Sequence, residues 1–252
     1  MPEELLREAG ISPEKHPHLV DELRAHLKEK PDWFVATALC TIIFLLFWYY
    51  LYLRRGILVP FLSEEPLALF LANKSLALTS LFAIGISLSI GPLARFFRSF
   101  KHKLEYRREI GLMGFFVGAA HILITLVFLT YRFPLVKYIE RWKAPLYGIM
   151  ALLILIVVAS ISTTAAIRKM GYRRWKFMQR LSYIAFILIA LHFSVMKYAE
   201  WVKWFASYDP VYPPGSLLAI IFVGLVLLLR ASVLVIDLAQ KDRYSSKIIK
   251  ND

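Results

Sequence analysis

Six long runs of apolar residues dominate this sequence of 252 residues. A helix needs about 20 apolar residues, at about 1.5 Å each, to cross about 30 Å of membrane hydrocarbon. Each of the six runs is long enough, which predicts an all-α protein built as a polytopic bundle of six transmembrane helices. The predicted spans are residues 33–53, 67–91, 109–131, 146–167, 177–196 and 217–238.

The composition excludes several other classes of protein. Hydrophobic residues make up 58% of the chain, well above the 45–50% or so that is usual for soluble domains. A single cysteine, Cys40, excludes an internal disulfide. We find no internal repeat, no glycine-rich phosphate loop, and no nucleophile or general-base pair, so we expect no catalytic residue in this chain.

The basic residues predict the orientation of the bundle. The net charge is +13, but most Lys and Arg lie between apolar runs, where they meet anionic lipid, so nucleic acid is not an expected partner. Loops and tails on the side of the termini carry 20 Lys and Arg, against eight on the other side. Because cytoplasmic loops are enriched in these residues, both termini are expected in the cytoplasm, and the protein in the inner or plasma membrane.

Three regions follow from this topology. Residues 1–32 lack an apolar signal-peptide core and predict a cytoplasmic segment of short amphipathic helices on the membrane surface. Residues 33–238 form the six-span domain, and residues 239–252 a basic cytoplasmic tail. Three histidines of the first region, for which we expect a solvated surface role, are His16, His18 and His26.

Only two histidines lie inside the predicted spans, His121 in the third and His192 in the fifth. An ionisable side chain within the membrane is rare and by default marks a functional site facing the bundle interior. Both spans run outward from the cytoplasm, and the two histidines lie 13 and 12 residues beyond Arg108 and Arg180. They therefore share a depth of about 18–20 Å from the inner surface, as two axial ligands of one haem iron require.

The neighbours of His121 are compatible with that use. Gly111, Gly114 and Gly118 lie on its face of the helix, where missing side chains leave room for a flat macrocycle or for a close helix. Arg132 lies 11 residues further on, a little over three turns. It could pair with a haem propionate, or extend its side chain to the outer interface without any cofactor.

A metal ion other than haem iron is less compatible with these two helices. Copper or zinc would need more ligands, and no third histidine, cysteine or carboxylate lies at this depth in either helix. The alternative function is a helical membrane protein without redox activity, such as a transporter or assembly factor. Its histidines would form hydrogen bonds between helices or a proton relay.

Two stretches of the sequence resemble the ferric-reductase-like transmembrane domain. They are RREIGLMGFFVGAAHIL, residues 107–123, and WKFMQRLSYIAFILIALHF, residues 175–193. Within that family they are most similar to the haem-binding membrane subunits of bacterial periplasmic methionine sulfoxide reductase systems. The resemblance implies a b-type cytochrome, the electron-transfer subunit of an oxidoreductase, with His121 and His192 as axial haem ligands. Electrons would come from a cytoplasmic flavin reductase or from quinol and leave to an outer acceptor or partner reductase.

The sequence departs from that family at Gln179. Relatives usually have a histidine at this position, where it is associated with a second, inner haem. Glutamine is a poor iron ligand, so we expect one haem b, with flavin or quinone covering the inner half of the membrane. Arg230 in the sixth span could line an inner cofactor or quinone pocket together with Gln179, or extend its side chain to the inner surface.

Overall fold

The computed structural model describes residues 31–56, 67–131, 133–140 and 142–249, and all regular elements within them are helices. Six of these helices are long and apolar enough to cross a membrane, which confirms the predicted all-α, six-span fold. The long helices are α3 (Pro31–Gly56), α4 (Leu67–Phe96), α5 (Arg107–Val127), α7 (Lys143–Ser160), α10 (Leu181–Ser207) and α11 (Gly215–Ile249). The short ones are η1 (Arg98–Leu104), α6 (Leu135–Glu140), α8 (Thr164–Met170) and α9 (Tyr172–Gln179).

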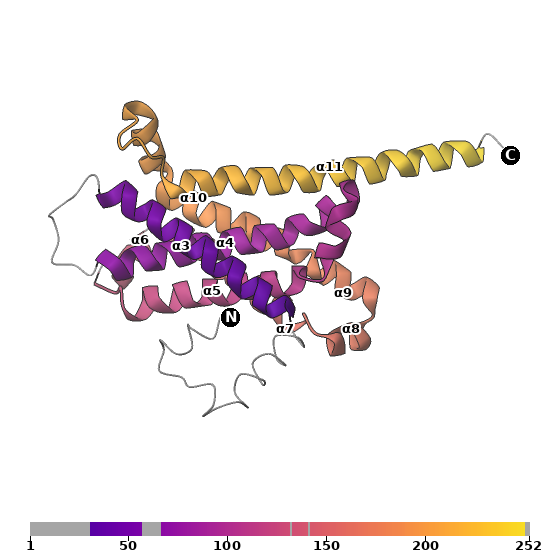
Figure 1. Cartoon of the computed structure of the whole chain (residues 1–252), viewed down its shortest axis with the longest axis horizontal. Helices are drawn as coiled ribbons and strands as arrows, with labels where there is room; N and C mark the ends of the chain where they lie inside the picture. The colour runs from indigo at the N-terminus through magenta and orange to yellow at the C-terminus, as the bar shows by residue number, and fades with distance from the viewer. Residues whose placement is uncertain (1–30, 57–66, 132, 141, 250–252) are drawn as a thin grey trace, which may run out of the picture.

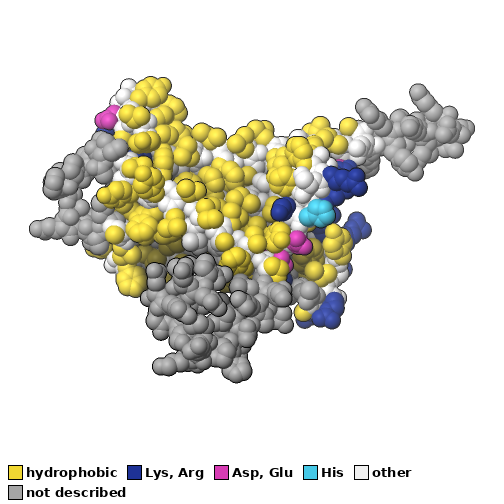
Figure 2. All heavy atoms as spheres, viewed as in Figure 1, with side chains coloured by type: hydrophobic (Ala, Val, Ile, Leu, Met, Phe, Trp, Pro, Cys, Tyr) yellow, Lys and Arg dark blue, Asp and Glu magenta, His cyan; other side chains and the backbone are white. Residues whose placement is uncertain are grey.

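The long helices run lengthwise through the bundle, with α3 oblique to the others (Figure 1), and the connections at the two ends of the bundle differ in charge. Figure 1 shows η1, α8 and α9 at the end past which α11 extends, while α6 lies at the opposite end. The loops that contain η1, α8 and α9 are the ones rich in Lys and Arg. In Figure 2, hydrophobic side chains cover much of the visible middle of the bundle. Lys, Arg and His side chains gather at the end past which α11 extends. Lipid contact explains why so many large apolar side chains are exposed.

Helix α4 is the centre of the bundle. In its most apolar window 56% of the residues are buried, against 11–22% in the other five long helices. It packs on α3, α5 and α11, and α7 packs mainly on α10. The largest buried cluster joins α4, α10 and α11 around Phe186, which is fully buried. The bundle therefore has two tightly packed helix pairs, α4–α5 and α7–α10, with α4 connecting them to the rest.

The fourth span ends earlier than its hydropathy predicts. We expected it to continue to residue 167, but α7 ends at Ser160 and a new helix, α8, begins at Thr164. Hydroxyl groups explain the break, because Ser160 and Ser162 donate to carbonyls of the last turn of α7. Thr163 then caps α8 by accepting a hydrogen bond from the backbone N–H of Ala166.

The two predicted cytoplasmic regions are only partly covered. Residues 1–30 lie outside the described residues, so the predicted surface helices and the three histidines there stay predictions. Part of the predicted tail is described, and it is helical, because α11 continues without interruption to Ile249.

Candidate functional site

His121 on α5 is fixed by Asn73 on α4. Its ring Nδ1 lies 2.9 Å from the Asn73 side-chain oxygen Oδ1 and 3.0 Å from the Asn73 backbone oxygen. Because both neighbours are acceptors, Nδ1 carries the proton and donates it, and the lone pair of the neutral ring stays on Nε2.

A third residue fixes the orientation of the Asn73 amide. Asn73 is 3% exposed, and its Nδ2 donates to the Thr125 hydroxyl at 2.8 Å. That hydroxyl donates in turn to the backbone oxygen of His121, also at 2.8 Å. The amide oxygen is therefore directed at the imidazole, so the three residues form one closed network of hydrogen bonds.

His192 on α10 is fixed in the same way by α7. Its Nδ1 lies 2.7 Å from the backbone oxygen of Ala144 and donates to it, which again leaves the lone pair on Nε2. The ring lies directly against Gly148, one turn further along α7. A Cβ atom added at Gly148 would lie 3.0 Å from Nδ1 and 3.3 Å from Cε1 of His192. The missing side chain is what lets the imidazole reach the Ala144 carbonyl.

Together the two imidazoles form a donor set that fits haem iron. Each presents Nε2 as its metal-binding atom, and each is held by a carbonyl acceptor on Nδ1–H, as is usual for histidines that bind metals. In the described part of the chain, no three His, Cys, Asp or Glu side chains gather at one place. A planar cofactor that supplies four ligands of its own needs only two such imidazoles.

The glycines before His121 pack against α4. A Cβ atom at Gly114 would lie 2.9 Å from Cγ1 and 3.1 Å from the backbone nitrogen of Ile84. One at Gly118 would lie 2.6 Å from the Ser80 hydroxyl, which donates to the Gly114 carbonyl. Of the two possibilities that the sequence left open, the structure contains the close helix. A contact of Gly114 or Gly118 with a cofactor stays a prediction.

The other predicted site residues that the structure describes do not join the two histidines. Arg132 lies outside the described residues. Gln179 donates from Nε2 to the Ser162 hydroxyl at 3.1 Å, which ties the end of α9 to the α7–α8 connection. The Arg230 guanidinium lies over the Tyr183 ring, 5.5 Å from its centre. No hydrogen bond joins Gln179 to Arg230 within the described chain, so a pocket shared by these two residues stays a prediction.

Three residues of the site were missed by the sequence analysis. Asn73 is a polar residue near the start of an apolar span, and this signal could have been used. Gly148 is one of 11 glycines, and nothing in the sequence relates it to His192. Ala144 contributes a backbone carbonyl, which any residue would supply, so no residue type could have identified it.

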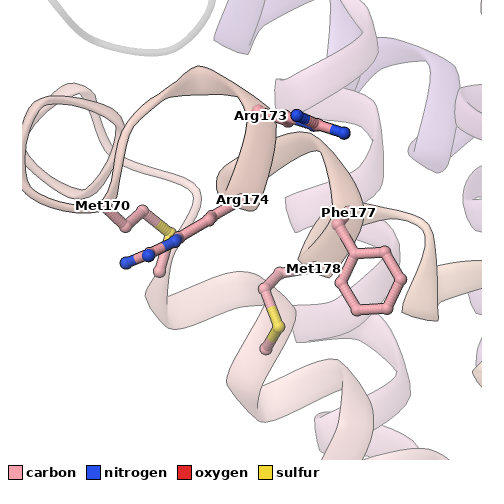
Figure 3. Close-up of a pocket in the computed structure, with 5 residues that line it drawn as sticks. All are labelled: Met170, Arg173, Arg174, Phe177 and Met178. Atoms are coloured by element: carbon pink, nitrogen blue, oxygen red, sulfur yellow. The ribbon is translucent and has the colours of Figure 1, made fainter.

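A separate hollow lies between α8 and α9 at the basic end of the bundle. It has a volume of about 580 Å³ and is lined by Met170, Arg173, Arg174, Phe177 and Met178. Figure 3 shows Met170 reaching it from α8 and the other four side chains from α9. Its lining holds no histidine or acidic side chain, so it is not part of the histidine site.

Comparison with known proteins finds one matching family and several relatives. The family described as ferric reductase like transmembrane component matches residues 34–190, a stretch that includes His121 and ends two residues before His192. The magnetosome protein MamZ of Magnetospirillum gryphiswaldense is 34% identical over 134 residues, which cover 52% of this chain and 20% of that protein.

Two further relatives carry the name of a heme-binding subunit, MsrQ, of protein-methionine-sulfoxide reductase. The one from Ralstonia nicotianae is 32% identical over 123 residues, 48% of this chain and 56% of its own. The one from Azospira oryzae is 32% identical over 143 residues, 55% of this chain and 58% of its own. The matches thus cover about a fifth of the first relative and somewhat over half of these two.

Proposed function

The chain belongs to the family of ferric reductase like transmembrane components, and from this premise we propose that it is a b-type cytochrome subunit of the cell membrane. One haem b is bound between α5 and α10, with His121 and His192 as the axial ligands of its iron. The subunit carries electrons across the membrane to an acceptor on the outer side. The observation that carries the proposal is that both imidazoles have Nδ1–H bonded to a carbonyl and Nε2 left for a metal.

The chain's own residues hold and tune the ligands. When bound, the haem iron supplies the one-electron chemistry. Asn73 and Ala144 keep each ring in the Nδ1–H tautomer and fix its orientation, and the hydrogen bonds that they accept make both imidazoles more basic. More basic ligands stabilise ferric iron, so these two bonds lower the reduction potential. The apolar spans around the rings exclude water and keep the dielectric low.

One haem is the number that the donor groups support. The family resemblance implies a histidine where this chain has Gln179, and the amide of Gln179 is bonded to Ser162. The remaining histidine of the described chain, His102, is exposed in η1, outside the spans. A second pair of axial imidazoles in the inner half of the membrane is therefore lacking within the described residues.

In the orientation that the basic loops predict, the haem lies in the outer half of the membrane. Both termini and the loops with η1, α8 and α9 lie in the cytoplasm, where Lys and Arg meet anionic lipid, as Arg173 and Arg174 would at the hollow between α8 and α9. Electrons enter from a cytoplasmic flavin reductase or from quinol, through a flavin or quinone near the inner surface. They leave to a redox partner outside, and the names of the MsrQ relatives favour a methionine sulfoxide reductase as that partner.

An absorption spectrum of the purified protein tests the proposal. The dithionite-reduced minus oxidised spectrum should be that of a low-spin b-type cytochrome, with about one haem per chain. Because each imidazole supplies one axial bond, His121→Ala and His192→Ala should both lose the low-spin spectrum. His102→Ala is the matched control and should keep it. A wild-type spectrum in both core variants would rule out these ligands.

The same experiment separates a second candidate function. Both histidines make hydrogen bonds between helices, to Asn73 and Ala144, which would also suit a membrane protein without redox activity. Such a protein should purify without haem even after expression with added haem. In that case the two bonds would only hold helices together, and both histidine variants would lower stability and nothing else.

The electron donor needs a separate measurement. Reduction of the haem in membranes supplied with quinol alone would identify quinol as the donor. If quinol fails and NADH with a flavin reductase succeeds, the donor is the cytoplasmic enzyme.

A further inference from the structure

Two cations share one carboxylate at the outer end of the bundle. Arg54, near the end of α3, places Nη1 3.1 Å from Oε1 of Glu200 on α10. Lys197, also on α10, places Nζ 3.0 Å from Oε2 of the same carboxylate. The Arg54 side chain is only 16% exposed, and those of Lys197 and Glu200 are 31% and 33% exposed. We call these three residues the outer charge cluster.

The outer charge cluster lies beyond His192 along α10. Lys197 follows His192 by five residues on the same helix, which is about 7.5 Å further toward the outer surface. On α4, Lys74 directly follows Asn73, the residue that holds His121. Along α10, the cluster thus lies between one and about two turns further toward the outer surface than His192.

The charges of the cluster do not cancel. Two cations contact one carboxylate, and each oxygen of that carboxylate already has its cation. Arg54 also donates from Nε to the backbone oxygen of Tyr212 at 3.2 Å, which fixes the guanidinium in place. No hydrogen bond within the described residues engages its Nη2. Because a half-buried surplus cation is costly without an anion, this arrangement favours an additional anionic group.

We propose that Arg54 and Lys197, held in place by Glu200, bind a propionate carboxylate of the haem. This inference rests on the proposed function. The Arg54 guanidinium is held by Glu200 and Tyr212 and keeps Nη2 for a further acceptor. Together with the Lys197 ammonium, it can donate charge-assisted hydrogen bonds to a single carboxylate. Arg132, which the sequence suggests as another partner of a propionate, lies outside the described residues. A carboxylate of an acidic partner protein shares this chemistry and is the competing source.

Binding of haem and of haem dimethyl ester, whose propionates carry no charge, tests the inference. Full-length apoprotein expressed without haem is titrated with each compound, and the ratio of the two affinities is measured. The unmodified chain should prefer haem by about tenfold or more, the value of one or two charge-assisted hydrogen bonds. Arg54→Gln and Lys197→Gln should each bring this ratio closer to one. Arg95→Gln, which removes an ion pair with Asp237 elsewhere, should leave it unchanged.

The outcomes separate this inference from the proposed function. If the apoprotein binds neither compound with a low-spin spectrum, both fail. If it binds both compounds equally well, or if Arg54→Gln and Lys197→Gln keep the full preference, the proposed function stands and the propionate assignment is overturned. In that case an acidic partner is the remaining occupant, and its binding should weaken in Arg54→Gln. If Arg54→Gln does not fold, Lys197→Gln alone carries the test, and a full preference for haem in that variant overturns the assignment.

Discussion

The two helix pairs hold their histidines by the same bond but by different means. On the α4–α5 pair, the Nδ1–H of His121 meets a side-chain oxygen and a backbone oxygen of Asn73. On the α7–α10 pair, the Nδ1–H of His192 meets only the backbone oxygen of Ala144. A substitution can remove the side-chain oxygen of Asn73, whereas no substitution removes the backbone carbonyl of residue 144. The α4–α5 pair therefore depends on side-chain chemistry, and the α7–α10 pair on the shape that Gly148 provides.

The largest effect is expected from filling the space at Gly148. Gly148→Val should reduce haem per chain at least tenfold, because a Cβ alone would already lie 3.0 Å from Nδ1 of His192 and the branched side chain would displace the ring. Haem content after purification measures the effect. Gly224→Val on α11 is the matched control, since a Cβ there meets no atom within 4 Å. Full haem content in Gly148→Val would show that the ring does not need this position.

The second largest effect is expected from removing the Asn73 side-chain acceptor on the α4–α5 pair. Asn73→Leu should raise the reduction potential and weaken haem binding by about tenfold, the lower end of what outer-shell partners of metal ligands contribute. The low value is expected because the backbone oxygen of residue 73 stays 3.0 Å from Nδ1. Redox titration measures the potential.

A change of opposite sign sharpens this test. Asn73→Asp replaces the amide oxygen by a stronger acceptor, which makes the imidazole more basic and should lower the potential. Ser75→Ala, which removes a buried hydroxyl bonded only within α4, is the control. Equal potentials in Asn73→Leu and Asn73→Asp would mean that His121 does not respond to its neighbour.

The third effect concerns how closely α4 and α5 approach. Gly114→Ala should destabilise the protein by about 1–3 kcal/mol, because the new methyl group meets the side chain and backbone of Ile84. Gly118→Ala should cost less, since it meets the Ser80 hydroxyl, which can rotate at the expense of one hydrogen bond. Thermal unfolding in detergent measures both variants, and Ser80→Ala should rescue Gly118→Ala. If haem content falls while stability is unchanged, the glycines border the cofactor instead.

These contacts also explain which features the sequence could predict. Apolar length alone predicts six spans, and His121 and His192 stand out because histidine is rare within such spans. The glycines before His121 were ambiguous, since a macrocycle and a helix need the same empty volume and only the positions of Ser80 and Ile84 decide. Contacts between distant segments, such as the one between Gly148 and His192, depend on how the helices pack, which a single sequence does not contain.

The smallest effect is expected from Thr125, whose side chain bonds the Asn73 amide and not the imidazole of His121. Thr125 fixes the Asn73 amide by accepting from its Nδ2, so Thr125→Val removes this bond and keeps nearly the same volume. The Asn73 oxygen keeps its place beside Nδ1 of His121 but loses its orienting partner. We therefore expect a rise in potential smaller than that of Asn73→Leu and a loss of about 1 kcal/mol or less in stability. Redox titration beside Asn73→Leu measures the difference, and Thr125→Ser, which keeps the hydroxyl, should match the wild type. An effect equal to that of Asn73→Leu would mean that the orientation of the amide, rather than the presence of an acceptor, sets the basicity of His121.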